Sequence, residues 1–156
     1  MRFAKLHGMH QEVLPPALDA DIAKLESDIG FPLPADYKAF LRDMNGAQAL
    51  DRCFYVRGLK QDIALHILLG VHPGRNWADL FSSWDEFNED LPENALIIGL
   101  DPGANFLVLL LDGNADGVYY WDHKHFFPQS SDLQNMYFVS ESFSFFIDEL
   151  KPLLKM

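Results

Sequence analysis

The stretch 111–118, with sequence LDGNADGV, combines carboxylate and amide oxygens with glycine, which is the chemistry of a calcium-binding loop. Asp112, Asn114, Asp116 and Gly117 fit the first half of an EF-hand loop, which alternates oxygen ligands and places glycine at the sixth position. The twelfth position requires a bidentate glutamate but is occupied by His123. Strand-like runs flank the stretch, and its Asp-Gly pairs are typical of tight β-hairpin turns. We therefore expect a hairpin turn, with a calcium site as the alternative.

A second candidate for metal chemistry is the pair His123 and His125, which would face the same side of a strand. A catalytic zinc ion takes three protein ligands, and no H-E-x-x-H motif supplies the others. The sequence also lacks a G-x-S-x-G elbow, a Walker loop and a G-x-G-x-x-G fingerprint. We therefore expect no catalytic residues, no cofactor and no resident metal. A metal-dependent hydrolase built on these histidines and nearby Asp residues is the least favoured alternative.

The charge balance is strongly acidic, with 12 Lys and Arg against 23 Asp and Glu, a formal net charge of −11. Nucleic acid is a poor partner for such a chain, because phosphate backbones bind through clustered Lys and Arg. Negative charge is densest between residues 85 and 93. The acidic residues of this segment are Asp85, Glu86, Glu89, Asp90 and Glu93. The segment is interpreted either as a solvated helix end or as a surface for a basic protein.

The sequence favours a cytoplasmic location. Cys53 is the single cysteine, so no internal disulfide can form. The N-terminus has no apolar stretch of signal-peptide length, and the longest apolar run, FLVLLL, is far too short to cross a bilayer. We expect no interaction with membranes.

The first third of the chain is predicted to be helical. Residues 1–16 lack periodicity and are expected to form an arm on the surface. Apolar residues recur at helical spacing over 18–29, and Gly30 follows as a C-cap. A second amphipathic helix is expected from Pro34 to the Asn-Gly pair at 45–46.

The middle of the chain mixes strands with one helix. The runs 53–58 and 63–71 are each expected to form a strand. An apolar pattern at helical spacing, which includes Trp77 and Phe87, predicts a third helix that ends before Pro92.

The last third is predicted to contain a β-meander of three strands at 95–100, 106–111 and 117–123. The middle run is apolar on both faces, which places it centrally in the sheet. A loop is expected over 126–134, followed by a helix over 142–154 that lies flat on the sheet. These elements predict a single α+β domain over residues 1–156, a mainly antiparallel sheet packed with about four helices.

The order of these motifs resembles the SUKH superfamily, which includes the fungal SMI/KNR cell-wall assembly regulators and many bacterial immunity proteins. The resemblance covers residues 18–154. Its first motif is carried by Leu25, Glu26, Gly30, Leu33, Pro34, Tyr37, Phe40, Leu41, Asn45 and Gly46. Its later motifs are carried by 97–101, Gly103, 106–112 and 118–123, and then by Ser142, Phe143, Phe146 and Leu150. The resemblance implies a non-enzymatic α+β module, and for bacterial members a cytosolic protein that neutralises a toxin by binding it.

Charge and resemblance together give a hypothesis for the partner. An acidic domain can occupy the basic cleft of a toxin, for example a nuclease, as a mimic of a polyanion. The predicted partner-binding residues are Asp85, Glu86, Glu89, Asp90, Glu93, Asp101, Asp112, Asp116 and Asp122. The alternative is a regulatory scaffold of the SMI/KNR type that binds cellular proteins. We expect a monomer or a weak homodimer.

Overall fold

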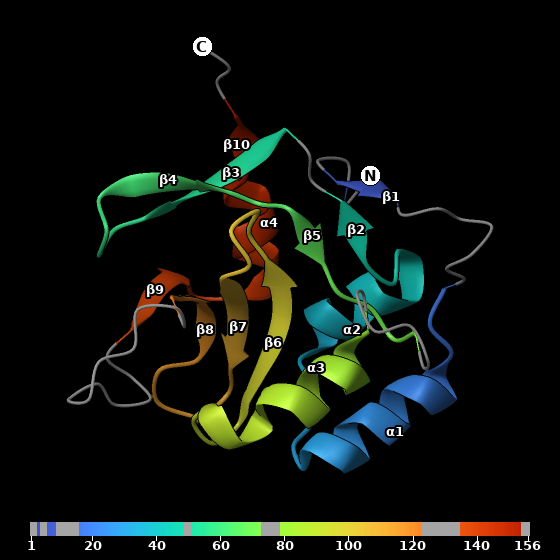
Figure 1. Cartoon of the computed structure of the whole chain (residues 1–156). Helices are drawn as coiled ribbons and strands as arrows, with labels where there is room; N and C mark the ends of the chain where they lie inside the picture. The colour runs from blue at the N-terminus through green and yellow to red at the C-terminus, as the bar shows by residue number, and fades with distance from the viewer. Residues whose placement is uncertain are drawn as a thin grey trace.

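The computed structural model describes residues 3, 6–8, 16–48, 51–72, 79–122 and 135–153. Within these ranges it forms a seven-stranded antiparallel sheet, a small three-stranded antiparallel sheet and four α-helices (Figure 1). The predicted α+β class with a mainly antiparallel sheet is confirmed. None of the helices in the described ranges has the length and apolar character that crossing a membrane requires.

The first two helices lie where the apolar periodicity predicts them. Helix α1 spans Asp19–Ile29 and ends at Gly30, whose φ of 86° is the left-handed conformation that glycine adopts without strain. Helix α2 spans Ala35–Asp43 and follows Pro34. Both helices bury their apolar stripes, and the two pack against each other beside the sheet (Figure 1).

The large sheet has the strand order β1-β2-β5-β6-β7-β8-β9. Its strands are β1 His7–Gly8, β2 Ala47–Gln48, β5 Ile67–Leu68, β6 Ala95–Leu100, β7 Phe106–Leu110, β8 Gly117–Trp121 and β9 Met136–Ser140. The predicted meander is confirmed as β6, β7 and β8. Every residue of β7 is buried, as expected for a run that is apolar on both faces.

The prediction of one strand over 63–71 is wrong, because the chain passes from one sheet to the other within it. Strand β4, Gln61–Ala64, pairs with β3, Arg52–Val56, in the small sheet, whereas β5 belongs to the large sheet. The crossing occurs where the N–H of Leu65 donates to the carbonyl of Arg52 and the N–H of His66 donates to that of Leu100. The apolar residues of this run are equally suited to a strand of either sheet, so the residue pattern does not reveal where the chain crosses.

Strand β9 was not predicted. It is the outer strand of the sheet and pairs only with β8 along the described chain. Its five residues are too few to show a clear alternation of apolar and polar side chains, which is the signal that predicts a strand. The expected loop over 126–134 lies outside the described residues.

Both chain ends also add short strands. In the expected N-terminal arm, β1 pairs with β2. At the other end, helix α4 spans Phe143–Glu149 and does not continue to residue 154 as predicted. It is followed by β10, Lys151–Pro152, which pairs with β3. The residue before a proline avoids the helical conformation, which explains why the helix stops ahead of Pro152.

Helix α3 spans Leu80–Phe87 and continues as the 3₁₀ helix η1, Asn88–Asp90. Its N-cap is Asp79, a buried residue whose carboxylate accepts hydrogen bonds from the N–H groups of Phe81 and Ser82 at 3.3 and 3.2 Å. The same carboxylate accepts from the backbone N–H of His72 at 3.0 Å. Asp79 therefore fixes where α3 begins. Trp77, which the predicted helix included, lies outside the described residues.

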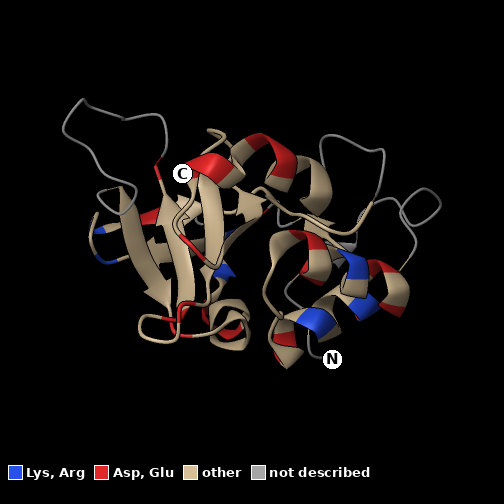
Figure 2. Ribbon diagram, turned by 90° about the horizontal axis from the view of Figure 1, so that it is seen from below, with Lys and Arg blue, Asp and Glu red and all other residues tan. Residues whose placement is uncertain are grey.

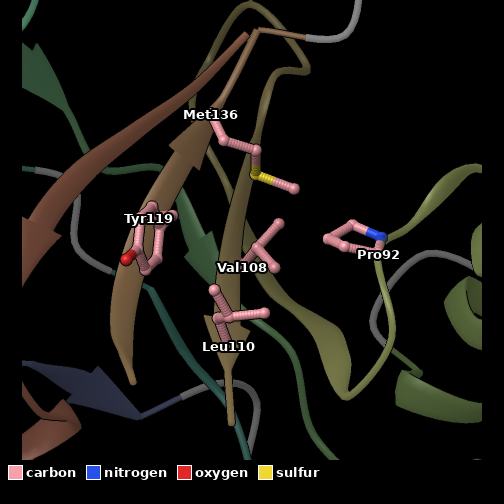
Figure 3. A pocket seen from close by; sticks show the side chains of 5 residues that line it. All are labelled: Pro92, Val108, Leu110, Tyr119 and Met136. Atoms are coloured by element: carbon pink, nitrogen blue, oxygen red, sulfur yellow. The ribbon is translucent and has the colours of Figure 1, made fainter. Parts of the chain in front are cut away.

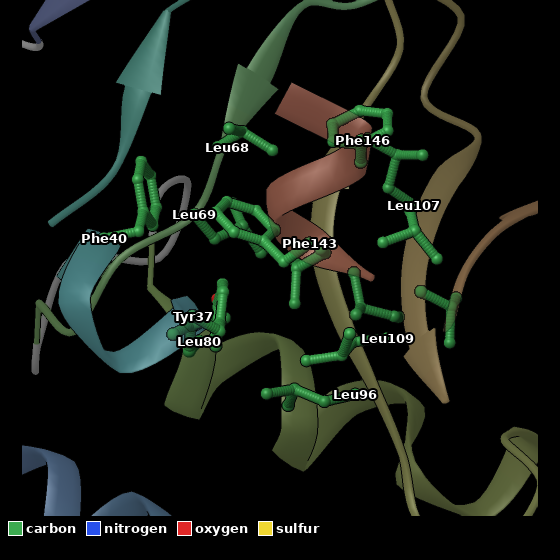
Figure 4. Packing of buried hydrophobic residues seen from close by; sticks show 14 of the residues in the cluster. Tyr37, Phe40, Leu68, Leu69, Leu80, Leu96, Leu107, Leu109, Phe143 and Phe146 are labelled. Carbon is green, nitrogen blue, oxygen red and sulfur yellow. The ribbon is translucent and has the colours of Figure 1, made fainter. Parts of the chain in front are cut away.

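One hydrophobic core joins these elements. Figure 4 shows aromatic side chains of α2 and α4 directed toward each other and toward the leucines of β6 and β7. The ring of Phe143 in α4 lies 5.0 Å from that of Tyr37 and 5.1 Å from that of Phe40. On the meander, the ring of Phe87 at the end of α3 lies 4.8 Å from that of Phe106 at the start of β7.

Candidate protein-binding surface

The stretch 111–116 is the connection of a β-hairpin, as predicted. Strands β7 and β8 pair directly up to Leu110 and Gly117. The Oδ1 atom of Asp112 accepts hydrogen bonds from the N–H groups of Asn114 and Ala115 at 2.9 and 2.7 Å. These bonds lower the pKa of the Asp112 carboxyl, because they stabilise its charged form. A second bond closes the turn, in which the Oδ1 atom of Asp116 accepts from the N–H of Gly113 at 2.7 Å.

The features that suggested metal chemistry are not assembled into a site within the described residues. The stretch 111–116 lies between two strands, whereas an EF-hand loop lies between two helices. No group of three His, Cys, Asp or Glu side chains is placed to hold a metal ion in the described ranges. His123 and His125 lie outside them.

The nine predicted binding residues fall into two groups. The turn 111–116 adjoins the segment 85–93, because the N–H of Leu111 donates to the carbonyl of Asn94 at 2.8 Å. Asp101 and Asp122 lie at the opposite end of the same strands, beyond the paired residues Leu100, Phe106 and Trp121. A strand of five residues separates the two ends by roughly 17 Å.

Asp101 has a structural environment. It is buried, and its Oδ2 atom accepts a hydrogen bond from the hydroxyl of Tyr120 at 2.6 Å. Its Oδ1 atom accepts from the N–H of Asn105 at 2.9 Å, which closes the turn between β6 and β7. Burial and the bond to Asp101 raise the pKa of Tyr120. Asp122 is half-buried at the end of β8.

A further carboxylate joins the first group through β9. Val118 of β8 pairs with Ser140, so Glu141 follows at the end of the sheet that carries the turn. Glu141 is exposed. Sequence reasoning missed it because β9 was not predicted, and only the pairing of β9 with β8 brings residue 141 to this place.

We call this group the acidic surface. It consists of the exposed residues Asp85, Glu86, Glu89, Asp90, Glu93, Asp112, Asp116 and Glu141. In the described part of the chain no Lys or Arg forms an ion pair with any of them, in contrast to the pairs formed elsewhere. Those pairs are Lys24–Asp28, Lys38–Glu26, Arg42–Asp19, Arg52–Asp51 and Lys151–Asp62.

The distribution of charge along the chain explains the contrast. Residues 76–123 contain ten Asp and Glu and no Lys or Arg, so nearly the whole net charge of −11 originates there. Figure 2 shows α3 and η1 with acidic positions only, whereas basic positions are grouped on α1 and α2 and around the β3–β4 hairpin. The acidic residues also lie in the last turn of α3 and beyond it, with no basic residue in that turn. Negative charge is unfavourable at a helix C-terminus, so these carboxylates do not stabilise the helix.

An apolar hollow lies between two parts of the acidic surface, namely the segment 85–93 and the turn 111–116. It is lined by Pro92, Val108, Leu110, Tyr119 and Met136. Figure 3 shows Val108 and Leu110 of β7 as its floor, with Pro92 on one side and Tyr119 on the other. The hydroxyl of Tyr119 donates to the carbonyl of Ala115 at 2.7 Å, so its polar atom is engaged in the turn and its ring faces the hollow.

Two carboxylates act on Tyr119, one of the residues that line the hollow. Burial raises the pKa of Tyr119, and the charges of Asp112 and Asp116 raise it further. Next to Tyr119, the ring of Phe138 packs edge-on at 5.5 Å and remains 43% exposed. An apolar depression, an exposed aromatic ring and a carboxylate rim are the parts of a protein-binding surface.

The comparisons with known proteins agree with this architecture. No curated protein matches the chain. The family model described as SMI1 / KNR4 family (SUKH-1) matches residues 16–149, which extend from three residues before α1 to the end of α4. The chain therefore belongs to the SMI1/KNR4 (SUKH-1) family, and membership supports a protein-binding module that acts in immunity or regulation.

Proposed function

We propose that this protein is a non-enzymatic immunity protein of the cytoplasm that neutralises a basic toxin domain by binding it through the acidic surface. The observation that carries the proposal is a set of exposed carboxylates that have no Lys or Arg partner within the described chain and that lie on two sides of an apolar hollow. The partner supplies the cations that this chain does not.

The charges act first on the rate of encounter. A surface of one sign attracts a partner of the opposite sign over about a Debye length, which is ~8 Å at physiological ionic strength. Such steering raises association rates roughly 10–1,000-fold above those of uncharged surfaces. A nuclease domain is a suitable partner because its substrate cleft must be basic, and an acidic protein that fills this cleft excludes the nucleic acid.

The binding of basic proteins tests the surface. The triple variant Glu89→Lys/Asp90→Lys/Glu93→Lys reverses part of it, and the control Asp19→Lys/Asp28→Lys/Asp43→Lys makes the same charge change on α1 and α2. In stopped-flow or surface plasmon resonance measurements with a basic toxin domain, we expect the first variant to associate at least about tenfold more slowly and to lose most of the salt dependence. Equal association rates for the two variants would remove the acidic surface from the proposal.

Growth rescue tests neutralisation itself. Co-expression with a toxin domain encoded next to this protein should restore growth, and the variant at residues 89, 90 and 93 should restore it less well than the control. A regulatory scaffold of the SMI/KNR type is the second candidate, since family membership supports either role. A scaffold would bind its partner through the same surface without restoring growth.

The absence of catalysis is a separate part of the proposal. Elemental analysis of the purified protein should show no stoichiometric zinc or calcium. One equivalent of either metal would instead favour the hydrolase built on His123 and His125, or the calcium loop at 111–116.

A further inference from the structure

The hollow on the outer face of the meander is shallow, with a volume of about 10 Å³, so it can receive the tip of a side chain. Its lining comes from three strands and one loop: Val108 and Leu110 from β7, Tyr119 from β8, Met136 from β9 and Pro92 from the segment before β6. All of these groups face the hollow with carbon or sulfur atoms (Figure 3). Since the strands are hydrogen-bonded to one another, the floor of the hollow is formed in advance of binding.

Carboxylates stand on two sides of the hollow. Pro92 is followed directly by Glu93 and lies two positions after Asp90, and both carboxylates are exposed. On the other side, Leu110 and Tyr119 flank the turn that carries Asp112 and Asp116. An apolar depression between two groups of carboxylates is complementary to an apolar side chain with a cation on either side of it.

We propose that the hollow receives one apolar side chain of a basic partner, and that Lys or Arg residues near it in the partner's chain pair with the carboxylates on both sides. The inference rests on the proposed function and specifies how the acidic surface recognises its partner. The acidic rim attracts any basic protein, whereas the hollow selects a basic segment with an apolar residue at its centre.

Physical considerations favour this occupant over a cation alone. A charged head group in the hollow would lose water and gain no hydrogen bond from the apolar lining. An aliphatic side chain there removes apolar surface of both partners from water. In an extended partner segment, residues two positions from the anchor point toward the same side and have long enough side chains to reach the rim.

A pair of synthetic peptides tests the inference. Acetyl-KKSLSKK-amide carries a leucine between lysines, and acetyl-KKSGSKK-amide has the same charge without the leucine. We expect the leucine peptide to bind about tenfold more tightly, because one aliphatic side chain becomes buried. In methyl-detected NMR titrations, the methyl groups of Val108, Leu110 and Met136 should shift with the leucine peptide and remain nearly unchanged with the glycine peptide.

One variant separates the hollow from the rim. Met136 is half-buried on the outermost described strand and packs at the margin of the core, and Met136→Gln leaves the charge unchanged. The variant should bind the glycine peptide as wild type does and lose most of the preference for leucine. The variant Glu89→Lys/Asp90→Lys/Glu93→Lys should instead weaken the binding of both peptides.

Several results would overturn the inference. Equal affinities for the two peptides, or methyl shifts located elsewhere, would leave the acidic surface as a purely electrostatic site and so preserve the proposed function. Methyl shifts that depend on protein concentration without peptide would assign the hollow to a second copy of this chain. Methyl shifts caused by the variant Phe126→Ser/Phe127→Ser without peptide would show that the hollow binds this protein's own segment around residues 126–127. Failure of the toxin to bind, together with tight binding of the leucine peptide, would refute the proposed function and keep the hollow as a receptor.

Discussion

Carboxylates have different surroundings in two regions of this molecule. On α1 and α2, Asp19 and Asp28 pair with Arg42 and Lys24 at 2.7 and 3.1 Å. On the acidic surface, exposed carboxylates lie along α3, η1 and the β7–β8 turn, and no Lys or Arg of the described chain pairs with them. In the first region, three basic side chains offset part of the charge of six carboxylates. The second retains a repulsion that a basic partner would relieve, so a net charge alone does not reveal where a protein binds.

The largest effect is expected where the acidic segment is attached to the fold. Asp79→Ala should lower the free energy of unfolding by about 2–4 kcal/mol, because the N–H groups of His72 and of the first turn of α3 lose a buried acceptor. Urea denaturation measures this change. Asp28→Ala on the exposed side of α1 is the control, and a similar midpoint for both variants would show that the Asp79 carboxylate does not hold α3 in place.

Reversing charge should affect stability with opposite signs in the two regions. Glu89→Lys/Asp90→Lys/Glu93→Lys should raise the free energy of unfolding by about 1 kcal/mol, because it reduces repulsion and places cations beyond the C-terminus of α3. The control Asp19→Lys/Asp28→Lys/Asp43→Lys should leave stability unchanged or lower it, since two ion pairs are lost. Chemical denaturation in urea at low salt measures both. The difference should shrink in ~1 M salt, where the Debye length is about 3 Å, and persistence there would rule out an electrostatic origin.

Acid should weaken the turn of the acidic surface. The pKa of Asp112 is lower in the folded protein than in the unfolded chain, where it is ~3.9. Its stabilising contribution is therefore present above that pH and is lost as the pH falls through the folded pKa. In thermal melts, Asp112→Asn should have a lower Tm than wild type at pH 6, and the gap should narrow toward pH 3. A gap that does not change with pH would mean that the charge of Asp112 does not contribute to the turn.

The smallest effect is expected for a single exposed ion pair. The side chains of Lys24 and Asp28 are 67% and 41% exposed, so water screens their attraction. Asp28→Asn should change the free energy of unfolding by less than about 0.5 kcal/mol in urea denaturation. A loss of several times this value would show that internal pairing stabilises α1 more than the comparison assumes.

The elements that sequence predicted correctly have a pattern that is complete within the element. Helices α1 and α2 show apolar residues at helical spacing and a terminal glycine or proline. Strand β7 is apolar on both faces, is buried along its whole length and has a paired strand at each edge. Strand β9 has one described neighbour and a mixed pattern, and the break between β4 and β5 lies inside an apolar run. Neither of these features is encoded locally.

The candidate site was likewise predicted only where its features are local in sequence. The density of carboxylates over 85–93 and the turn chemistry of 111–116 are local properties, and both are found at the acidic surface. Asp101 has the same residue type and also follows a strand, yet the hydroxyl of Tyr120 and the N–H of Asn105 engage its carboxylate in a buried turn. Whether a carboxylate faces solvent depends on contacts with residues that are distant in the chain.

The sequence by itself determined the α+β class, the two leading helices, the hairpin turn and the excess of negative charge, because each follows from residue type and short-range spacing. Tertiary structure decided which carboxylates share a surface, added Glu141 to them and formed the hollow beside them. Strand pairing and the position of Pro92 beside the meander bring together residues from 85 to 141. These residues are distant in sequence, so no local pattern predicts that they lie close together.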